Sequence, residues 1–523
     1  TLLYLFYSME SVLNAESLPS WDSMTDAELV TTTQLVVTAA GDQKKFTYTS
    51  EFKKDLSQVI SRRWLNATSY VRCGLIQVVR IVSRDGNGVN SLLSTELLEN
   101  ILGSSGLPTV SQADVDGDEK KEALKCLVNA LYYSMEGRNL FMLSGANVGL
   151  TSSLCKESND EMRYFYMHLT FIITALNNNA QALMREDGEL VHELCVEAMN
   201  WSNEKNANEA LKVLFNLYCY AKDLSATAHS LIAQKVTETC VKNVYNVPRG
   251  SSILQNTINL LATLPILEDI LFPAKKTEDA DTLKSLIYEG RNVAVAKKVM
   301  EDLSDKLDSR SNDNDEEDID LLGTYFTFLT RSCVANKQVR RYCRFEILPP
   351  LQADDVKRPP EEGETLRNKI IRVIQSTSRT HDLASDFLFV LCKRSVTRLI
   401  KYTGLGHSAG ILANSGLLGS INEARRNSDS EDSETEDYKN VEDKVNPVTG
   451  YIREDRPDPM EGMSEEQKEY EALKLVQAMD SLMSAGIIKP GTIGPDGKPV
   501  GVSHVLELVK DVKTPDVSDD DSD

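Results

Sequence analysis

The stretch Glu122–Tyr133, EALKCLVNALYY, contains the pattern that decides the fold. Its apolar residues at positions 124, 127, 128 and 131 follow an i, i+3, i+4, i+7 spacing, which forms one apolar stripe on a helix. The stripe recurs at residues 75, 169, 211 and, in a degraded form, 258, so that successive stripes begin 49, 45, 42 and 47 residues apart. HEAT and armadillo arrays have a repeat of about 40–47 residues, and each of their units buries its apolar face only against its neighbours. The sequence therefore predicts an all-α, armadillo/HEAT-like α-solenoid.

A register of polar residues accompanies the stripes. The position five residues after each stripe begins is polar in every copy: Arg80, Asn129, Thr174, Asn216 and Thr263. At about 100° per residue it lies about 150° from the centre of the stripe, so we expect it to face outward. The position at i+9, Arg84 in the first copy and Tyr133 in the second, shares that face. Stacked repeats would align these faces into a binding groove. The alternative is that they are ordinary solvated positions on amphipathic helices.

Composition narrows the class of protein. Hydrophobic residues make up 41% of the 523 residues and charged residues 26%, which is ordinary for a soluble globular chain. No apolar run approaches the roughly 20 residues that span a bilayer. The start, TLLYLFYSMESVL, lacks a basic region and is predicted to be a helix, not a signal peptide. The missing initiator Met suggests an incomplete or processed sequence.

The cysteine pattern and the net charge argue against metal sites and against non-specific nucleic-acid binding. The nine cysteines include no CxxC pair and the six histidines have no ligand spacing, so we expect reduced thiols in a cytoplasmic protein and no metal site. The net charge is −22, of which −15 lies from Ser428 to the end. A chain this acidic is a poor candidate for non-specific nucleic-acid binding, which requires neutralisation of phosphates.

Composition shifts divide the chain into four parts. They are a solenoid over 1–426, an acidic linker over 427–463, an amphipathic helix over 464–486 and a flexible tail over 487–523. The linker contains SDSEDSETEDY, which places acids three residues after Ser428 and Ser433, as acidophilic kinases require. Phosphorylation would add about 1.5–2 negative charges per site. The alternative is a linker that is disordered, acidic and merely solubilising.

The predicted C-terminal helix has clear boundaries. Ser464 and Gln467 form a potential capping box, and Gly486 can terminate the helix. Its apolar stripe includes Leu475 and Met479. A helix isolated after a linker must dock on its own solenoid or on a partner.

Two other motifs are less specific indicators of function. Lys337, Arg340 and Arg341 belong to KQVRRYCR, which is either an anion-binding patch at one end of the groove or a solvated helix face. The run TGLGHSAG (403–410) superficially resembles a phosphate loop, but it lacks the GK[ST] ending and follows a helix. No catalytic motif appears in a supporting context, so we expect no catalytic residues and no cofactor.

Nine segments together resemble the synembryn family, also called resistance to inhibitors of cholinesterase. In chain order they are EALKCLVN, EALKVLFN, ILPPL, LRNKIIRVI, FLFVLC, IKYTGLGHSAGILANSGLL, the acidic serine tract, NPVTG and PMEGMSEEQKEYEALKLV. The resemblance covers most of the chain and is strongest from Ile347 onward. The N-terminal residues match poorly.

The resemblance implies a solenoid that binds heterotrimeric G-protein α subunits (Gα), GDP-bound and free of βγ. Family members act as folding chaperones and as non-receptor guanine nucleotide exchange factors without covalent catalysis, and they hold the C-terminal helix of Gα in the concave groove. The groove residues that match are Arg80, Arg84, Asn129, Asn216, Lys337, Arg340 and Arg341. The helix that carries Leu475 and Met479 would hold another Gα surface.

The resemblance also implies regulation and location. The family's phosphorylation sites match Ser428 and Ser433, so an acidophilic kinase is an expected partner. We expect a cytoplasmic protein, without stable membrane insertion, recruited to the cell cortex or plasma membrane through Gα. Asn256 stands where relatives carry His, which puts any imidazole contact there in doubt.

Two other function classes stay open. A passive armadillo adaptor or transport receptor would bind an extended peptide without changing GDP release, and repeated asparagines suit it. An enzyme would require an active site of an unrecognised kind.

Overall fold

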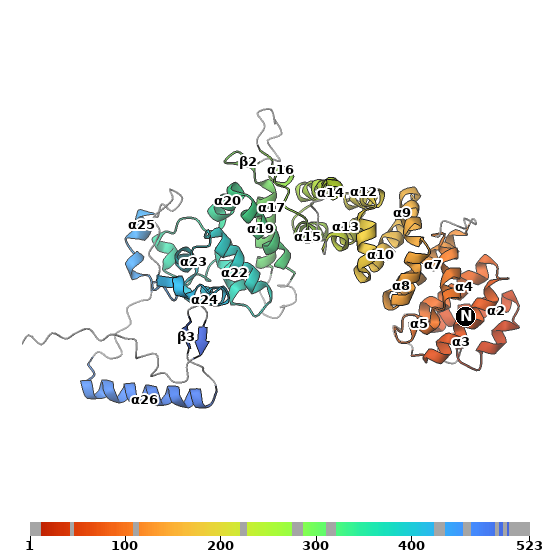
Figure 1. Cartoon of the computed structure of the whole chain (residues 1–523), viewed down its shortest axis with the longest axis horizontal. Helices are drawn as coiled ribbons and strands as arrows, with labels where there is room; N and C mark the ends of the chain where they lie inside the picture. Colours follow the sequence, from red (N-terminus) through yellow and green to blue (C-terminus); the bar gives the residue numbers. More distant parts are fainter. Residues whose placement is uncertain are drawn as a thin grey trace, which may run out of the picture. The chain divides into compact units, whose positions relative to one another are not determined.

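The computed structural model is almost entirely helical (Figure 1). It describes residues 12–41, 47–107, 115–219, 227–274, 286–309, 321–422, 435–452, 462–486, 491–494 and 499–501. Among these, the strands form two antiparallel pairs, β1 (Ile287–Tyr288) with β2 (Arg291–Asn292) and β3 (Gly491–Ile493) with β4 (Pro499–Gly501). The chain divides into two compact units, Thr1–Leu271 and Phe272–Asp523.

The first unit is a solenoid of stacked helices, as predicted. Its elements are η2 (Leu18–Asp22), α2 (Asp26–Ala40), α3 (Ser50–Trp64), α4 (Ser69–Val82), α5 (Val89–Leu92), α6 (Thr95–Ser105), α7 (Gly117–Tyr133), α8 (Met135–Leu143), α9 (Ala146–Lys156), α10 (Asp160–Leu176), α11 (Asn178–Arg185), α12 (Gly188–Ala198), α13 (Glu204–Tyr218), α14 (Thr227–Asn246), α15 (Ser252–Leu261) and α16 (Glu268–Leu271). One row runs α2, α4, α7, α10, α13 and α15, each packed on the next, and a second runs α3, α6, α8, α9, α12 and α14.

Four of the five predicted stripes lie on helices of the first row, α4, α7, α10 and α13, and the degraded fifth begins on α15 and continues past its last residue, Leu261. The residues that open the stripes are completely buried: Leu75, Leu124, Leu169, Leu211 and Ile258. Each helix begins after a side chain that accepts a hydrogen bond from a backbone N–H of the first turn, and these caps are Thr68, Asp116, Asn159, Asn203 and Ser251. Apolar spacing and capping residues therefore fix the same helices.

The prediction that the polar register faces outward is wrong for two of its members. Thr174 is completely buried and Asn216 is 8% exposed. The Asn216 amide of α13 donates to the Phe171 carbonyl oxygen (3.1 Å) and to Thr174 Oγ1 (3.3 Å) of α10. The Asn129 amide of α7 likewise donates to the Arg80 carbonyl oxygen of α4 (3.4 Å). Neighbouring helices approach on this flank, so these polar groups bridge adjacent repeats.

The second unit is helical but less regular. It contains β1, β2, α17 (Ala294–Asp308), α19 (Gly323–Ala335), α20 (Lys337–Ile347), η3 (Ala353–Val356), α21 (Leu366–Gln375), α22 (Thr380–Leu391), α23 (Val396–Thr403), α24 (Leu405–Asn414), η4 (Leu418–Asn422), α25 (Glu436–Lys439), η6 (Glu442–Lys444), α26 (Glu465–Ser484), β3 and β4. The family-like segment LRNKIIRVI (366–374) lies on α21, and FLFVLC (387–392) lies across the C-terminal end of α22.

Residues 435–452, which we call the strap, lie against the other helices of the second unit. The Thr435 hydroxyl donates to the Leu351 carbonyl oxygen (2.5 Å), and the backbone N–H of Ile452 donates to the Val356 carbonyl oxygen (2.8 Å). Between these points the ring of Tyr438, 3% exposed, lies 4.3 Å from Lys401 Nζ. The strap occupies part of the predicted linker 427–463, whereas Ser428 and Ser433 lie outside the described residues.

The glycine-rich run 403–410 contacts the backbone of the strap. Gly404 separates α23 from α24 with φ +77°, and a Cβ there would lie 2.9 Å from Gly450 N. The next two backbone N–H groups, of Leu405 and Gly406, donate to the carbonyl oxygens of Pro447 (2.8 Å) and Val448 (2.9 Å). Most of the run is helical. Gly404 and Gly406 lack a side chain, which allows the backbone of the strap to approach closely.

Candidate partner-binding groove

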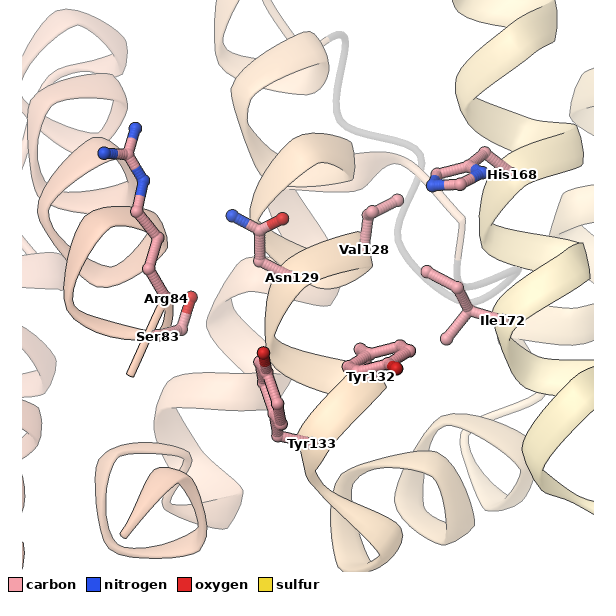
Figure 2. A pocket seen from close by; sticks show the side chains of 8 residues that line it. All are labelled: Ser83, Arg84, Val128, Asn129, Tyr132, Tyr133, His168 and Ile172. Carbon is pink, nitrogen blue, oxygen red and sulfur yellow. The ribbon is translucent and has the colours of Figure 1, made fainter. Parts of the chain in front are cut away.

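An open pocket of about 290 Å³ lies between the turn that ends α4 and the neighbouring helices α7 and α10 of the first unit (Figure 2). Its lining consists of Ser83, Arg84, Val128, Asn129, Tyr132, Tyr133, His168 and Ile172. Arg84, Asn129 and Tyr133 are three of the positions that the sequence placed on a groove. Figure 2 shows Arg84 on one side, the α7 side chains in the middle and His168 on the other side.

The two arginines of the predicted groove have different surroundings. Arg84 lies in the pocket lining, and its Nη1 donates to the Gly41 carbonyl oxygen at 3.4 Å. Arg80 is not part of that lining; its Nε lies 3.1 Å from a carboxylate oxygen of Glu122, whose other oxygen accepts from Lys125 (2.9 Å). Arg80 therefore joins α4 to α7, while Arg84 supplies a cation to the pocket.

Aromatic side chains supply much of the pocket's apolar surface. Tyr132 and Tyr133 are 55% and 50% exposed, although tyrosine is usually more buried in a repeat core. The Tyr133 ring packs against Gly86, where a Cβ would lie 2.6 Å from the ring. Exposed aromatic rings beside a cation are typical of protein-binding surfaces.

The sequence interpretation missed a row of stacked rings along α10. Tyr164 and His168 stack with ring centroids 5.4 Å apart, and His168 and Phe171 stack at 6.1 Å. Lys205 Nζ lies 3.6 Å from the Tyr164 centroid on the same row. The i, i+4, i+7 spacing of these three residues, outside the apolar stripe, was the signal available in the sequence.

The imidazole of His168 is held by a buried carboxylate of α13. Its Nδ1 lies 2.7 Å from Glu209 Oε1, and the Glu209 side chain is 3% exposed. Burial raises the pKa of Glu209, but the bonds from His168 and Lys212 outweigh it and hold that pKa below its usual value. Glu209 is therefore an ionised anchor behind the wall of the pocket.

The other predicted binding residues lie elsewhere. Asn216 is buried between α10 and α13, outside the pocket lining. Lys337, Arg340 and Arg341 belong to the second unit, on α20. There Arg340 Nη1 donates to the Cys333 carbonyl oxygen at the end of α19 (3.2 Å), and Arg341 pairs with Glu289 (2.8 Å). Both arginines therefore hold their own unit together, and Lys337 is exposed.

Helix α26 begins with the predicted capping box of Ser464 and Gln467. Leu475 is 62% exposed and Met479 is half-buried. Tyr470 and Leu473 are exposed on the same helix. Apolar side chains exposed at this density are typical of a helix that docks on a partner.

Two thiols of the first unit have raised pKa values. Burial raises the pKa of Cys126 to about 12 and that of Cys73 to about 11, so both thiols are protonated at neutral pH. Within the described residues, no group of three or more His, Cys, Asp or Glu could hold a metal ion, and no helix is long and apolar enough to cross a membrane.

The family model described as "Guanine nucleotide exchange factor synembryn" matches residues 75–498, which include the pocket and the strap. The chain belongs to the synembryn family. It is 37% identical to "Chaperone ric-8" of Caenorhabditis briggsae over 505 residues, covering 86% of this chain and 88% of the relative. It is 32% identical to "Chaperone Ric-8A" of Danio rerio over 492 residues, covering 86% and 87%.

Likeness to solved structures is weaker. An engineered protein matches with a TM-score of 0.42 and 14% identity over 78% of this chain and 96% of its own. The karyopherin Kap121p bound to the extreme C-terminus of the phosphatase Cdc14p matches with a TM-score of 0.36 and 10% identity, over 81% and 41%. The names printed for the family model and for these relatives are those of a guanine nucleotide exchange factor and of chaperones.

Proposed function

We propose that this protein binds Gα, GDP-bound and free of βγ, through the groove of its first unit, and that it acts as a folding chaperone and a non-receptor exchange factor. The observation that carries the proposal is the pocket on α4, α7 and α10. It combines a cation, amide and hydroxyl groups and exposed aromatic rings on one face. Family membership supplies the class of partner.

The pocket suits the C-terminal end of an amphipathic helix. Such an end presents unpaired carbonyl oxygens and a chain-terminal carboxylate, which favour a cation. Arg84 can bind a carboxylate with two parallel N–H donors, and the Asn129 side chain adds polar contacts. The rings of Tyr132 and Tyr133 offer the surface on which the apolar face of the helix would lie.

Exchange follows from binding alone. If the groove holds the C-terminal helix of Gα only when that helix leaves its native packing, binding stabilises the form of Gα whose nucleotide pocket is loosened. GDP then dissociates without any covalent step. During folding the same surface would hold the helix until the rest of Gα is formed.

Other parts of the chain contribute in this proposal. The apolar side chains of α26, among them exposed Leu475 and half-buried Met479, hold a second surface of Gα. Arg80 and Asn216 hold adjacent helices of the groove in place, and Lys337, Arg340 and Arg341 add positive charge from the second unit. Phosphorylation of Ser428 and Ser433 by an acidophilic kinase would fix the path of the tail on a basic surface. The cytoplasmic protein reaches the cell cortex through Gα.

GDP release from purified Gα tests the proposal. The wild-type protein should accelerate release in a concentration-dependent way, and deletion of the last residues of Gα should abolish the effect. The double variant Arg84→Ala/Asn129→Ala should lose most of the acceleration while keeping its helical circular dichroism. Arg62→Ala is the matched control, because Arg62 is exposed and pairs with Asp22 on η2. Tight binding with unchanged GDP release would instead support the passive adaptor.

A further inference from the structure

The two sides of the pocket differ in hydrogen-bonding character. On the α4 side Arg84 offers only donors. On the α10 side stands His168, whose ring is 29% exposed and has one nitrogen turned toward α7 (Figure 2). The character of that nitrogen depends on where the ring carries its proton.

The contact with Glu209 decides where the proton lies. An ionised carboxylate only accepts hydrogen bonds, so the 2.7 Å contact requires a proton on His168 Nδ1. Lys212 lies 3.4 Å from the second oxygen of Glu209, which further favours the ionised carboxylate. In the neutral imidazole, Nε2 is then an acceptor. It has no hydrogen-bond partner among the described residues.

Two further contacts hold the ring in place. Tyr164 and Phe171 stack on it nearly in parallel, with interplanar angles of 12° and 13°. A ring fixed both by a buried carboxylate and by two stacked neighbours presents Nε2 in one direction. Such fixed polar groups determine which partner atoms can bind.

We propose that His168 is a specificity-determining residue of the groove, whose Nε2 accepts a hydrogen bond from an N–H or O–H group of the bound segment, with Glu209 as its positioning residue. The pocket is then polarised, with donors from α4 and an acceptor from α10. A chain end would lie with its carboxylate toward Arg84 and a side-chain N–H or O–H group toward His168, because backbone N–H groups in the last turn of a helix are bonded within that helix. This inference rests on the proposed function, because it assigns the direction of the segment in the same groove.

A comparison of three variants separates this role from simple ring packing. His168→Gln places an amide near the position of Nε2, His168→Asn places one near Nδ1, and His168→Phe keeps only the stacked ring. We expect His168→Gln to bind Gα within about twofold of wild type, and the other two to lose about five- to tenfold, the range for one hydrogen bond. Full binding by His168→Phe would overturn the proposal, because stacking would then be sufficient.

Glu209→Gln tests the positioning residue. Its amide can donate to Nδ1, which moves the proton to Nε2 and turns the acceptor into a donor. Nitrogen NMR of protein labelled at its six histidines should show a proton on Nδ1 of His168 in the wild type and on Nε2 in the variant. The variant should also bind Gα about five- to tenfold more weakly. An unchanged tautomer or unchanged binding would contradict the assigned role.

A synthetic peptide with the C-terminal sequence of Gα identifies the donor. Removal of one side-chain N–H or O–H donor of the peptide at a time should weaken binding at one position, and that penalty should disappear in His168→Phe, as in a double-mutant cycle. If the wild type binds the peptide but no position is coupled to His168, this inference fails and the proposed function stands. If the wild type binds neither the peptide nor Gα, the proposed function fails, and the inference fails with it.

Discussion

The predicted binding arginines Arg84, Arg340 and Arg341 have different surroundings in the two units. In the first unit Arg84 lines an open pocket beside exposed aromatic rings. In the second unit Arg340 caps the end of α19 and Arg341 pairs with Glu289, so both groups hold their own helices in place. A basic cluster in a sequence therefore does not by itself locate a binding surface. What distinguishes the pocket is that its cation stands beside apolar surface left uncovered by the stacking.

The units also differ in how their helices are held together. The first unit joins neighbouring helices by side chains placed at the repeat spacing, such as Asn129 on the Arg80 carbonyl oxygen. The second unit uses the strap, which brings Thr435 to Leu351 across 84 positions of sequence. Repeats supply local connections, whereas an irregular array needs a distant segment to close it.

The largest expected effect is the loss of stability of the first unit when a buried cation is removed. Lys53 of α3 is completely buried, and its Nζ donates to Asp85 Oδ2 (2.9 Å), the Asp85 carbonyl oxygen (3.0 Å) and the Asn87 carbonyl oxygen. Lys53→Met leaves Asp85 without its cation and should lower the free energy of unfolding by about 3–5 kcal/mol. Urea unfolding followed by circular dichroism measures it. Because the turn at Gly86 contacts Tyr133, Gα binding should also weaken.

The control for this variant is Lys54→Met, which removes an exposed lysine from the same helix. It should change the free energy of unfolding by less than about 0.5 kcal/mol. Equal stability of the two variants would show that the turn is held by other contacts.

The next largest effect is a loss of stability of the second unit when the packing of the strap is disturbed. Gly404→Val places a side chain where Gly450 N would lie 2.9 Å from Cβ, at a positive φ that disfavours side chains. We expect a loss of about 3 kcal/mol, confined to the second unit. Hydrogen exchange should increase in α23, α24 and the strap and stay unchanged in α4, α7 and α10.

Gly410→Ala is the matched control on α24, because a Cβ there would meet no atom within 4 Å. Alanine favours a helix over glycine, so this variant should be neutral or slightly stabilising. Faster exchange across both units in Gly404→Val would mean that the units do not respond separately.

A smaller effect is pH-dependent and belongs to the first unit. Glu119 of α7 accepts from Arg72 (2.8 Å), Ser104 and Ser69 and is 1% exposed. Burial raises its pKa, but these hydrogen bonds together hold it below the usual 4.5. The stabilisation is therefore complete above about pH 4.5 and is lost as pH falls through the lower pKa of the folded state.

Urea unfolding between pH 3 and 6 measures this dependence. The stability of the wild type should fall more steeply with acid than that of Glu119→Gln, which is less stable at pH 6 but has lost this titrating group. Glu99→Gln, on the exposed side of α6, should follow the wild type. Parallel curves for all three proteins would mean that Glu119 does not contribute.

The sequence predicted the features that are determined within a single helix. The stripes on α4 and α7 and the cap at Ser464 follow from spacing and residue type, and the structure has them. The burial of Thr174 does not follow, because a helical wheel describes one helix and not the neighbour that covers its flank. The pairing of His168 with Glu209, 41 residues away, also depends on how two repeats stack.

The smallest effect on stability gives the sharpest comparison of the two units. Arg84→Ala and Arg341→Ala remove the same side chain from each unit, and both should leave the free energy of unfolding within about 1 kcal/mol. Their effects on Gα affinity should differ. Arg84 lies at the pocket, and we expect about a tenfold loss, as for one charge-assisted hydrogen bond. Arg341 lies outside the pocket lining, so about a twofold loss is expected. Equal losses would mean that Arg341 contributes to Gα binding as much as the pocket arginine. A larger loss for Arg341 would move the main binding surface to the second unit.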